Sequence, residues 1–115
     1  MLLAALAAAS VAAGPTPIIA QPQWMRVPNG RDVARYYPDG AQKARLNGAA
    51  VVTCKVTAAG TLESCAVVEE TPSGWGFGEA ALRLTSLFRM RPTTADGSRV
   101  EGGVVRIPIR FILPR

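Results

Sequence analysis

The chain has 115 residues, enough for one domain, and its 13 Lys and Arg against eight Asp and Glu give a formal net charge of +5 at pH 7. The basic residues are spread out without interleaved aromatic side chains, which predicts a solvated cationic surface and argues against a nucleic-acid-binding face. Histidine is absent and only two cysteines are present, which excludes the commonest general base and a structural zinc site built from these residue types alone.

The first 25 residues carry no charge, and residues 1–13 consist almost entirely of Ala, Leu and Val. As a helix this stretch would rise about 20 Å, too little to cross a hydrocarbon core of about 30 Å. Prolines follow directly, and Ala13 and Ala20 stand at plausible cleavage positions. We interpret residues 1–20 as a secretory signal peptide or, because the start lacks Lys and Arg, as a truncated membrane anchor.

Residues 21–36 are predicted to form a Pro-containing linker, in which Trp24 is an isolated aromatic that packs on the domain. The domain itself is expected over residues 37–115. A short helix over 38–46 comes first, because proline is favourable at a first helical position. Two alternating runs, 49–56 and 62–69, then predict a β-hairpin whose turn contains Gly60, since glycine supplies the positive φ that tight turns require.

Cys54 and Cys65 lie on the two strands of this hairpin. If Ala59 and Gly60 form a two-residue turn, the cysteines face each other with a Cα separation of about 5.5 Å. A bulged three-residue turn would instead shift the register by one. Export favours oxidation, and the pair has no C-x-x-C spacing, so we predict a disulfide that acts as a structural staple rather than a redox pair.

After residue 74 the hydrophobic period becomes helical, with apolar side chains on one stripe at Phe77, Ala80, Ala81, Leu84, Leu87 and Phe88. This amphipathic helix must end by Arg91, because Pro92 disfavours helical geometry in the residue before it. The fold class predicted from these elements is α+β. We expect a small antiparallel sheet of about three strands, one main helix packed on one face, and a short N-terminal helix.

The final stretch, residues 104–113, alternates apolar side chains with Arg106, Pro108 and Arg110, which predicts a half-buried strand. Pro108 has no N–H for a ladder, so the strand is expected at an edge of the sheet. An open edge either is protected against aggregation or serves as a docking site for an extended peptide.

No catalytic constellation is visible in the sequence. Glu69 and Glu70 are adjacent on a strand and point to opposite faces, and no serine has a histidine to activate it. The glycine-rich stretch 73–78 lacks the Lys and Ser or Thr of a phosphate-binding loop. We therefore predict that the protein is not an enzyme and uses no cofactor or metal.

The order of these elements resembles the C-terminal domain of TonB over most of residues 37–113. The matching features, in order, are Tyr37-Pro38, the hairpin around Gly60, Gly78-Glu79-Ala80-Ala81-Leu82, Phe88-Arg89-Met90-Arg91-Pro92, Asp96-Gly97 and Ile107-Pro108-Ile109-Arg110-Phe111. The resemblance implies a periplasmic energy-transducer domain of a Gram-negative bacterium. Its implied partners are outer-membrane TonB-dependent transporters, and the inner-membrane ExbB–ExbD complex if a longer, anchored form exists.

The resemblance also implies where partners bind. Such domains pair the TonB box, a short extended segment of the transporter, with the edge of the last strand, so the expected binding residues are Val104, Arg106, Pro108, Arg110 and Ile112. For the two arginines, simple protection of a solvated edge is an equally good interpretation. The alternative function is an envelope structural or assembly domain that forms a homodimer through the same edge strand.

Overall fold

The computed structural model describes residues 17–114, so most of the predicted signal peptide or anchor lies outside the described residues. The elements follow one another as β1 (Trp24–Arg26), α2 (Gly30–Arg35), α3 (Asp39–Lys43), β2 (Gly48–Val56), β3 (Leu62–Thr71), α4 (Phe77–Leu84), the 3-10 turn η1 (Thr85–Leu87), β4 (Arg89–Met90) and β5 (Val104–Phe111).

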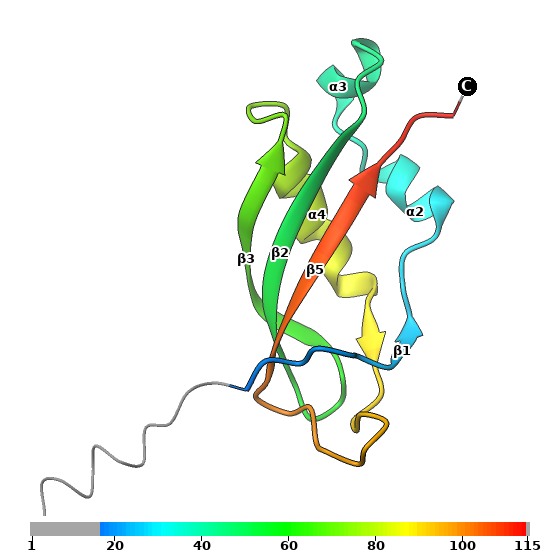
Figure 1. The fold of residues 1–115 in the computed structure, drawn as a ribbon. Helices are drawn as coiled ribbons and strands as arrows, with labels where there is room; N and C mark the ends of the chain where they lie inside the picture. Colours follow the sequence, from blue (N-terminus) through cyan, green and yellow to red (C-terminus); the bar gives the residue numbers. More distant parts are fainter. Residues whose placement is uncertain (1–16, 115) are drawn as a thin grey trace, which may run out of the picture.

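The principal sheet has three antiparallel strands in the order β3-β2-β5, and α4 covers one of its faces (Figure 1). This arrangement confirms the predicted α+β class, the three-stranded sheet and the edge position of the last strand. A second sheet, in which β1 pairs with β4, was not expected. It forms because the chain becomes extended at β4, directly after the helical segment. The backbone of these two residues then pairs with β1, which precedes the helices of the domain.

The core lies between α4 and the covered face of the sheet. Alternate residues of β2 and β5 point into it, as the period-two patterns require: Ala50, Val52, Cys54, Val56, Val105, Ile107, Ile109 and Phe111. The helix contributes the predicted stripe. Its residues Phe77, Ala80, Ala81 and Leu84 are buried, and Phe88 beyond the 3-10 turn is buried as well. Small residues at positions 80 and 81 allow the helix to approach the sheet closely.

An aromatic cluster joins the N-terminal helices to this core. The rings of Tyr37, Phe77 and Phe111 lie within 5.3–5.9 Å of one another, centre to centre. The Tyr37 hydroxyl donates to the carbonyl oxygen of Leu46 at 2.6 Å and lies 3.3 Å from that of Phe111. Burying a tyrosine is favourable only when its hydroxyl finds such partners, so the cluster fixes the end of β5 against the helical segment.

The segment predicted as a linker, residues 21–36, contains two of the domain's elements. In β1, the Trp24 ring packs edge-on against Phe88 with centroids 5.1 Å apart, which matches the expectation that this aromatic contacts the domain. A capping box stabilises the N-terminus of α2. In it, the side chains of Asn29 and Asp32 each accept a hydrogen bond from the backbone N–H of the other residue. The predicted helix over 38–46 is shorter than expected, and Pro38 is its N-cap rather than its first residue.

The hairpin turn has three residues, 58–60, rather than two. The Thr57 N–H donates to the Thr61 carbonyl at 2.9 Å, and Gly60, with φ of +86°, closes the turn. A second irregularity compensates for the shifted register. Ser64 takes a left-handed φ of +50° where the pairing shifts between Thr53 and Lys55, and the extra residue returns Cys65 to a position facing Cys54.

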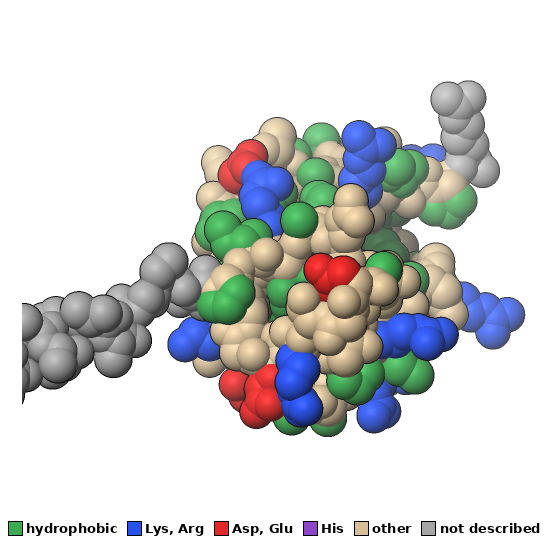
Figure 2. Space-filling view, turned by 60° about the horizontal axis from the view of Figure 1, so that its bottom comes forward, with side chains coloured by type: hydrophobic (Ala, Val, Ile, Leu, Met, Phe, Trp, Pro, Cys, Tyr) green, Lys and Arg blue, Asp and Glu red, His purple; other side chains and the backbone are tan. Residues whose placement is uncertain are grey.

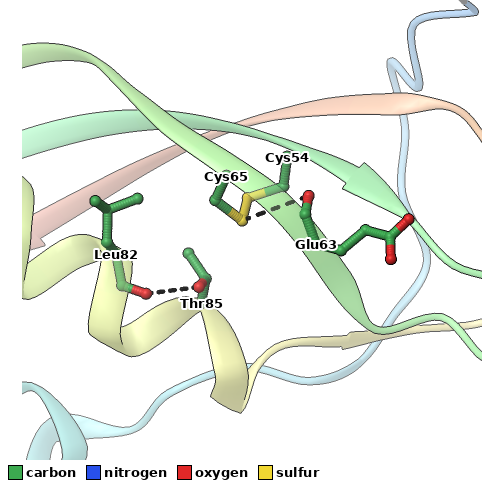
Figure 3. The surroundings of a disulfide bond; sticks show 5 residues. All are labelled: Cys54, Glu63, Cys65, Leu82 and Thr85. Atoms are coloured by element: carbon green, nitrogen blue, oxygen red, sulfur yellow. Dashed lines mark hydrogen bonds between the residues drawn. A yellow bond between two sulfur atoms is a disulfide. The ribbon is translucent and has the colours of Figure 1, made fainter.

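Cys54 and Cys65 are joined by a disulfide on the covered side of the sheet, near Leu82 and Thr85 of the helical segment (Figure 3). Their Cα atoms are 4.1 Å apart, closer than the predicted value of about 5.5 Å. Cys54 directs its backbone N–H and C=O toward Val105 of β5, so toward β3 it occupies a non-hydrogen-bonded position, where strands approach more closely.

This geometry predicts that the folded, exported protein has no free thiol before reduction and two afterwards. The cysteines are 11 positions apart, and closing a loop of this length is worth roughly 2.5–3 kcal/mol in the chain-entropy model. Urea unfolding of oxidised and reduced protein should therefore differ by about that free energy. Two reactive thiols in the unreduced folded protein would contradict the staple.

The tip of the hairpin packs against β4 through Gly60. Its carbonyl accepts the Met90 N–H at 2.8 Å, and a Cβ at Gly60 would lie only 1.9 Å from the Met90 carbonyl oxygen. Glycine is thus required here twice, by its positive φ and by the close approach of backbone.

Replacing Gly60 with alanine is expected to lower the free energy of unfolding by about 2–4 kcal/mol, because the strained φ and the clash with backbone add. Gly97→Ala is the matched control. Gly97 has a φ of +88° but nothing within 4 Å of its Cβ position, so it should lose only about 1 kcal/mol. Equal losses in urea denaturation would show that the Met90 contact is unimportant.

Candidate functional site

The two edges of β5 have different occupants. Its register with β2 is unbroken from Gly48–Phe111 to Lys55–Val104. Because backbone groups alternate in direction along a strand, only every second residue of β5 can serve the β2 ladder. The hydrogen bonds of Val104 show which set of residues pairs with β2. Its N–H donates to the Pro17 carbonyl and its C=O accepts the Ile19 N–H, so Val104 faces away from β2. Residues 105, 107, 109 and 111 therefore face β2, and the even-numbered residues face outward.

Arg106, Pro108, Arg110 and Ile112 continue this outward set, so all five residues expected from the sequence lie along one edge. Four of them are unpaired by any other strand among residues 17–114, whereas the backbone groups of Val104 are already bonded to Pro17 and Ile19. We call residues 106–112 the free edge of β5. Pro108 lacks its N–H on this side, and the β2 ladder loses no donor. Between Arg106 and Arg110 the edge offers the N–H groups of both arginines and the carbonyl oxygens of residues 106, 108 and 110.

The other edge of the sheet is less regular. β3 shifts register against β2 at two places, and its residues are mostly exposed, with Val67 and Val68 among the exposed large hydrophobic side chains. Bulges of this kind bend and twist a strand and so hinder the addition of another. The straight, regularly paired β5 is therefore the better template for an incoming strand.

The two arginines of the free edge differ in their surroundings. The Arg106 guanidinium forms a 2.7 Å ion pair with Glu69 across β2, on the face of the sheet that α4 does not cover. Arg110 has no acidic partner among residues 17–114. An exposed ion pair such as Arg106–Glu69 contributes at most about 1 kcal/mol to the stability of the fold, but it engages the Arg106 guanidinium. Arg110 is thus the cation of this edge that remains available to a partner.

A short segment of the chain covers the beginning of the same edge. We call residues 17–19 the N-terminal strap. The Ile19 N–H donates to the Val104 carbonyl at 2.8 Å, the Val104 N–H donates to the Pro17 carbonyl at 2.9 Å, and Ile18 thereby pairs with Val104 in parallel. Figure 1 shows this blue segment crossing the lower end of β5. The strap was not predicted from the sequence, because the alanine-rich start dominated the interpretation of residues 1–20.

An apolar groove of about 500 Å³ adjoins the opposite end of the free edge. It lies between α2 and the end of β5 and is lined by residues that include Val33, Ala34, Tyr37, Arg110, Ile112 and Leu113. Ile112 is 61% exposed there. The free edge is therefore bounded by the strap at one end and by this groove at the other.

The loop that leads into β5 is fixed by a compact polar turn. The Thr94 hydroxyl and the Ser98 N–H both donate to one carboxylate oxygen of Asp96. These bonds, led by that of Thr94, lower the pKa of the Asp96 carboxyl to about 2. The Asp96 carboxylate thus stays anionic over the ordinary pH range, and the turn that it accepts bonds from precedes β5 by a few residues.

The remaining surface carries mixed charge. On the face shown in Figure 2, Lys and Arg side chains stand apart, with acidic and hydrophobic side chains between them. No group of three or more Cys, Asp or Glu side chains within the described range is placed to hold a metal ion. Among residues 17–114, no helix combines the length and apolar character needed to cross a membrane.

Comparison with known proteins adds an independent result. The family model described as the Gram-negative bacterial TonB protein C-terminal matches residues 33–113. An uncharacterized protein of Caulobacter vibrioides is 33% identical over 62 residues, which are 54% of this chain. The match spans 62% of that curated relative, which is less than two thirds of its length.

Two solved structures share the fold. The TonB C-terminal domain of Pseudomonas aeruginosa, determined by NMR in solution, superimposes with a TM-score of 0.61 at 18% identity, covering 84% of this chain and 91% of that one. The TonB2 protein of Vibrio anguillarum gives 0.50 at 16% identity, covering 89% and 91%. At these identities the structural likeness establishes the fold alone.

The asymmetry of β5 predicts a pattern of amide hydrogen exchange. The amides of Val105, Ile107 and Ile109, which face β2, should exchange at least ~10-fold more slowly than those of Arg106 and Arg110, since an open edge leaves its N–H groups to water. Val104, which bonds to the strap, should be protected as well. NMR exchange measurements at residue level test this, and equal protection of Arg106 and Ile107 would contradict an open edge.

Proposed function

The chain belongs to the family of Gram-negative bacterial TonB C-terminal domains, and on this premise we propose that it is a periplasmic domain that binds the TonB box of outer-membrane TonB-dependent transporters. The extended TonB box would add a strand along the free edge of β5 and so serve energy-coupled transport. The observation that carries the proposal is the run of outward backbone groups between Arg106 and Ile112, which no other strand of the described chain pairs with.

Strand addition suits this edge in its chemistry. Main-chain hydrogen bonds supply affinity without demanding a particular sequence, and each contributes about 0.5–1.5 kcal/mol net. Pro108 removes one bond from the middle of the edge, which together with the entropic cost of association favours a modest, reversible complex. A transducer that must engage and release its transporter benefits from such an affinity.

Side chains add selectivity to the backbone pairing. Arg110 has no acidic partner within residues 17–114, and the chain as a whole carries a net charge of +5. A partner segment with an acidic residue near Arg110 would therefore be drawn to the edge and held by a charge-assisted hydrogen bond. Arg106, already paired with Glu69, would serve mainly to keep the uncovered face of the sheet soluble.

The proposal includes a place in the cell. A TonB-family domain implies a protein of the Gram-negative envelope. In a longer, membrane-anchored form the same domain would also be linked to the ExbB–ExbD complex, which delivers the energy that the domain transmits. We assign it no enzymatic role, since the proposed activity is recognition of an extended segment.

The test is a titration with a synthetic TonB-box peptide, comparing Arg110→Pro with Arg110→Ala. Proline at 110 removes an outward N–H and leaves the β2 ladder whole, so binding should weaken at least ~10-fold. Alanine keeps the N–H and removes only the charge, so binding should weaken a few-fold. Isothermal titration gives the affinities, and circular dichroism checks that both variants remain folded.

Amide chemical shifts in the same titration locate the contact. Perturbations are expected along residues 104–113, and perturbations confined to α4 with none on β5 would refute edge docking. Mass measurement over a range of protein concentrations addresses the alternative. A dimer that forms without peptide and dissociates in Arg110→Pro would assign the edge to self-association instead.

A further inference from the structure

The N-terminal strap occupies the same kind of position that a partner strand would take. It lies on the outward side of β5, it runs in extended conformation, and it uses the backbone N–H and C=O of Val104 at 2.9 and 2.8 Å. Each of these bonds is one that an added strand makes with an edge residue. The domain thus carries a segment of its own chain at the first position of its own docking edge.

The strap is held by few contacts. Ile18 is 77% exposed, so its side chain contributes almost nothing. Ile19 is partly buried and packs over Gly103, where a Cβ would lie 2.8 Å from the Ile19 Cδ1 atom. The strap therefore depends on two backbone bonds and one aliphatic side chain, which occupies the space beside Gly103 that a Cβ there would crowd.

The contacts that hold the rest of the N-terminal segment do not involve the strap. The chain turns away from β5 after Ile19 and is held again at Gln23, whose carbonyl accepts the Arg91 N–H at 2.8 Å, and then by the pairing of β1 with β4. These contacts lie on another part of the domain. Release of residues 17–19 therefore leaves the second sheet and the Trp24 packing in place.

We propose that the N-terminal strap is a displaceable competitor of the partner strand at the edge of β5. This inference rests on the proposed docking function. A segment that pairs only with residues 106–112 binds beside the strap, whereas one that extends to Val104 must displace it, because the Val104 N–H and C=O are already bonded there. The strap thereby sets how much of the edge a partner can reach.

Only molecules in which the strap is open can pair a partner with Val104. The apparent affinity for a long partner segment is therefore the intrinsic affinity multiplied by the fraction of molecules with an open strap. The experiment compares Ile19→Asp with the matched control Ile18→Asp, which introduces the same charge one residue away on a side chain already exposed. The probe is a synthetic TonB-box peptide of about nine residues, long enough to span positions 104–112. Ile19→Asp should bind it ~5–10-fold more tightly than the unmodified chain, and Ile18→Asp should bind it as the unmodified chain does.

A measurement on the free proteins shows whether the strap has been released. The Val104 amide should exchange ~5–10-fold faster in Ile19→Asp, matching the gain in affinity, and remain protected in Ile18→Asp. Released Val104 with unchanged peptide affinity would overturn the competition while leaving edge docking intact. Absence of peptide binding to all three proteins, including the one with the open edge, would overturn the docking function itself and the competition with it.

The unmodified chain provides a second test that needs no variant. On saturation with the nine-residue peptide, the amide signals of Ile19 and Val104 should shift together with those of Arg106 and Arg110. Shifts at Arg106 and Arg110 that spare Ile19 and Val104 would show that the partner and the strap bind side by side, and would refute displacement.

Discussion

The pairing of β5 with β2 is the interaction on which the rest of this domain depends. A strand has a period of two in both its side chains and its backbone groups, so one choice of register decides two things at once. The odd-numbered residues of β5 bury their side chains under α4 and give their amides to β2. The even-numbered residues point outward, where Val104 bonds to the strap and Arg106, Pro108 and Arg110 direct their side chains and backbone groups to solvent. Core and free edge are therefore two consequences of one register.

The parts of this arrangement that depend on local periodicity were predictable from the sequence. The alternation over residues 104–113 indicated the edge strand, and the helical stripe from Phe77 indicated the helix that covers the sheet. The side on which Pro108 loses its donor was not predictable, because it depends on the pairing with Val51 of β2, almost sixty positions away in the chain. The sequence predicted that Pro108 lies in an edge strand. The register with β2 shows that the missing N–H of Pro108 is on the side of β5 that faces away from β2.

Other features could not be predicted because they compensate for each other or compete with a stronger signal. The three-residue turn at Gly60 displaces the register of the hairpin, and the bulge at Ser64 restores it, so the cysteines face each other although the simple two-residue turn does not occur. The strap lies in a segment whose apolar composition suggested export or anchoring. Two adjacent isoleucines flanked by polar residues and prolines were its only local signal, and β-propensity without a visible partner strand is weak evidence.

The chemistry of the free edge also distinguishes a foreign segment from a second copy of the chain. An antiparallel self-pairing centred on Pro108 would bring two prolines to the interface, whereas an added peptide meets only one, so self-pairing loses twice as many ladder donors. It would also set Arg106 opposite Arg110 of the second copy, and like charges directly across a ladder are destabilising. Pro108, Arg106 and Arg110 thus disfavour pairing of the edge with a second copy of the chain. The same residues leave the edge open to a neutral or acidic partner. Edge protection and docking, which the sequence presented as alternatives, are compatible roles of one strand.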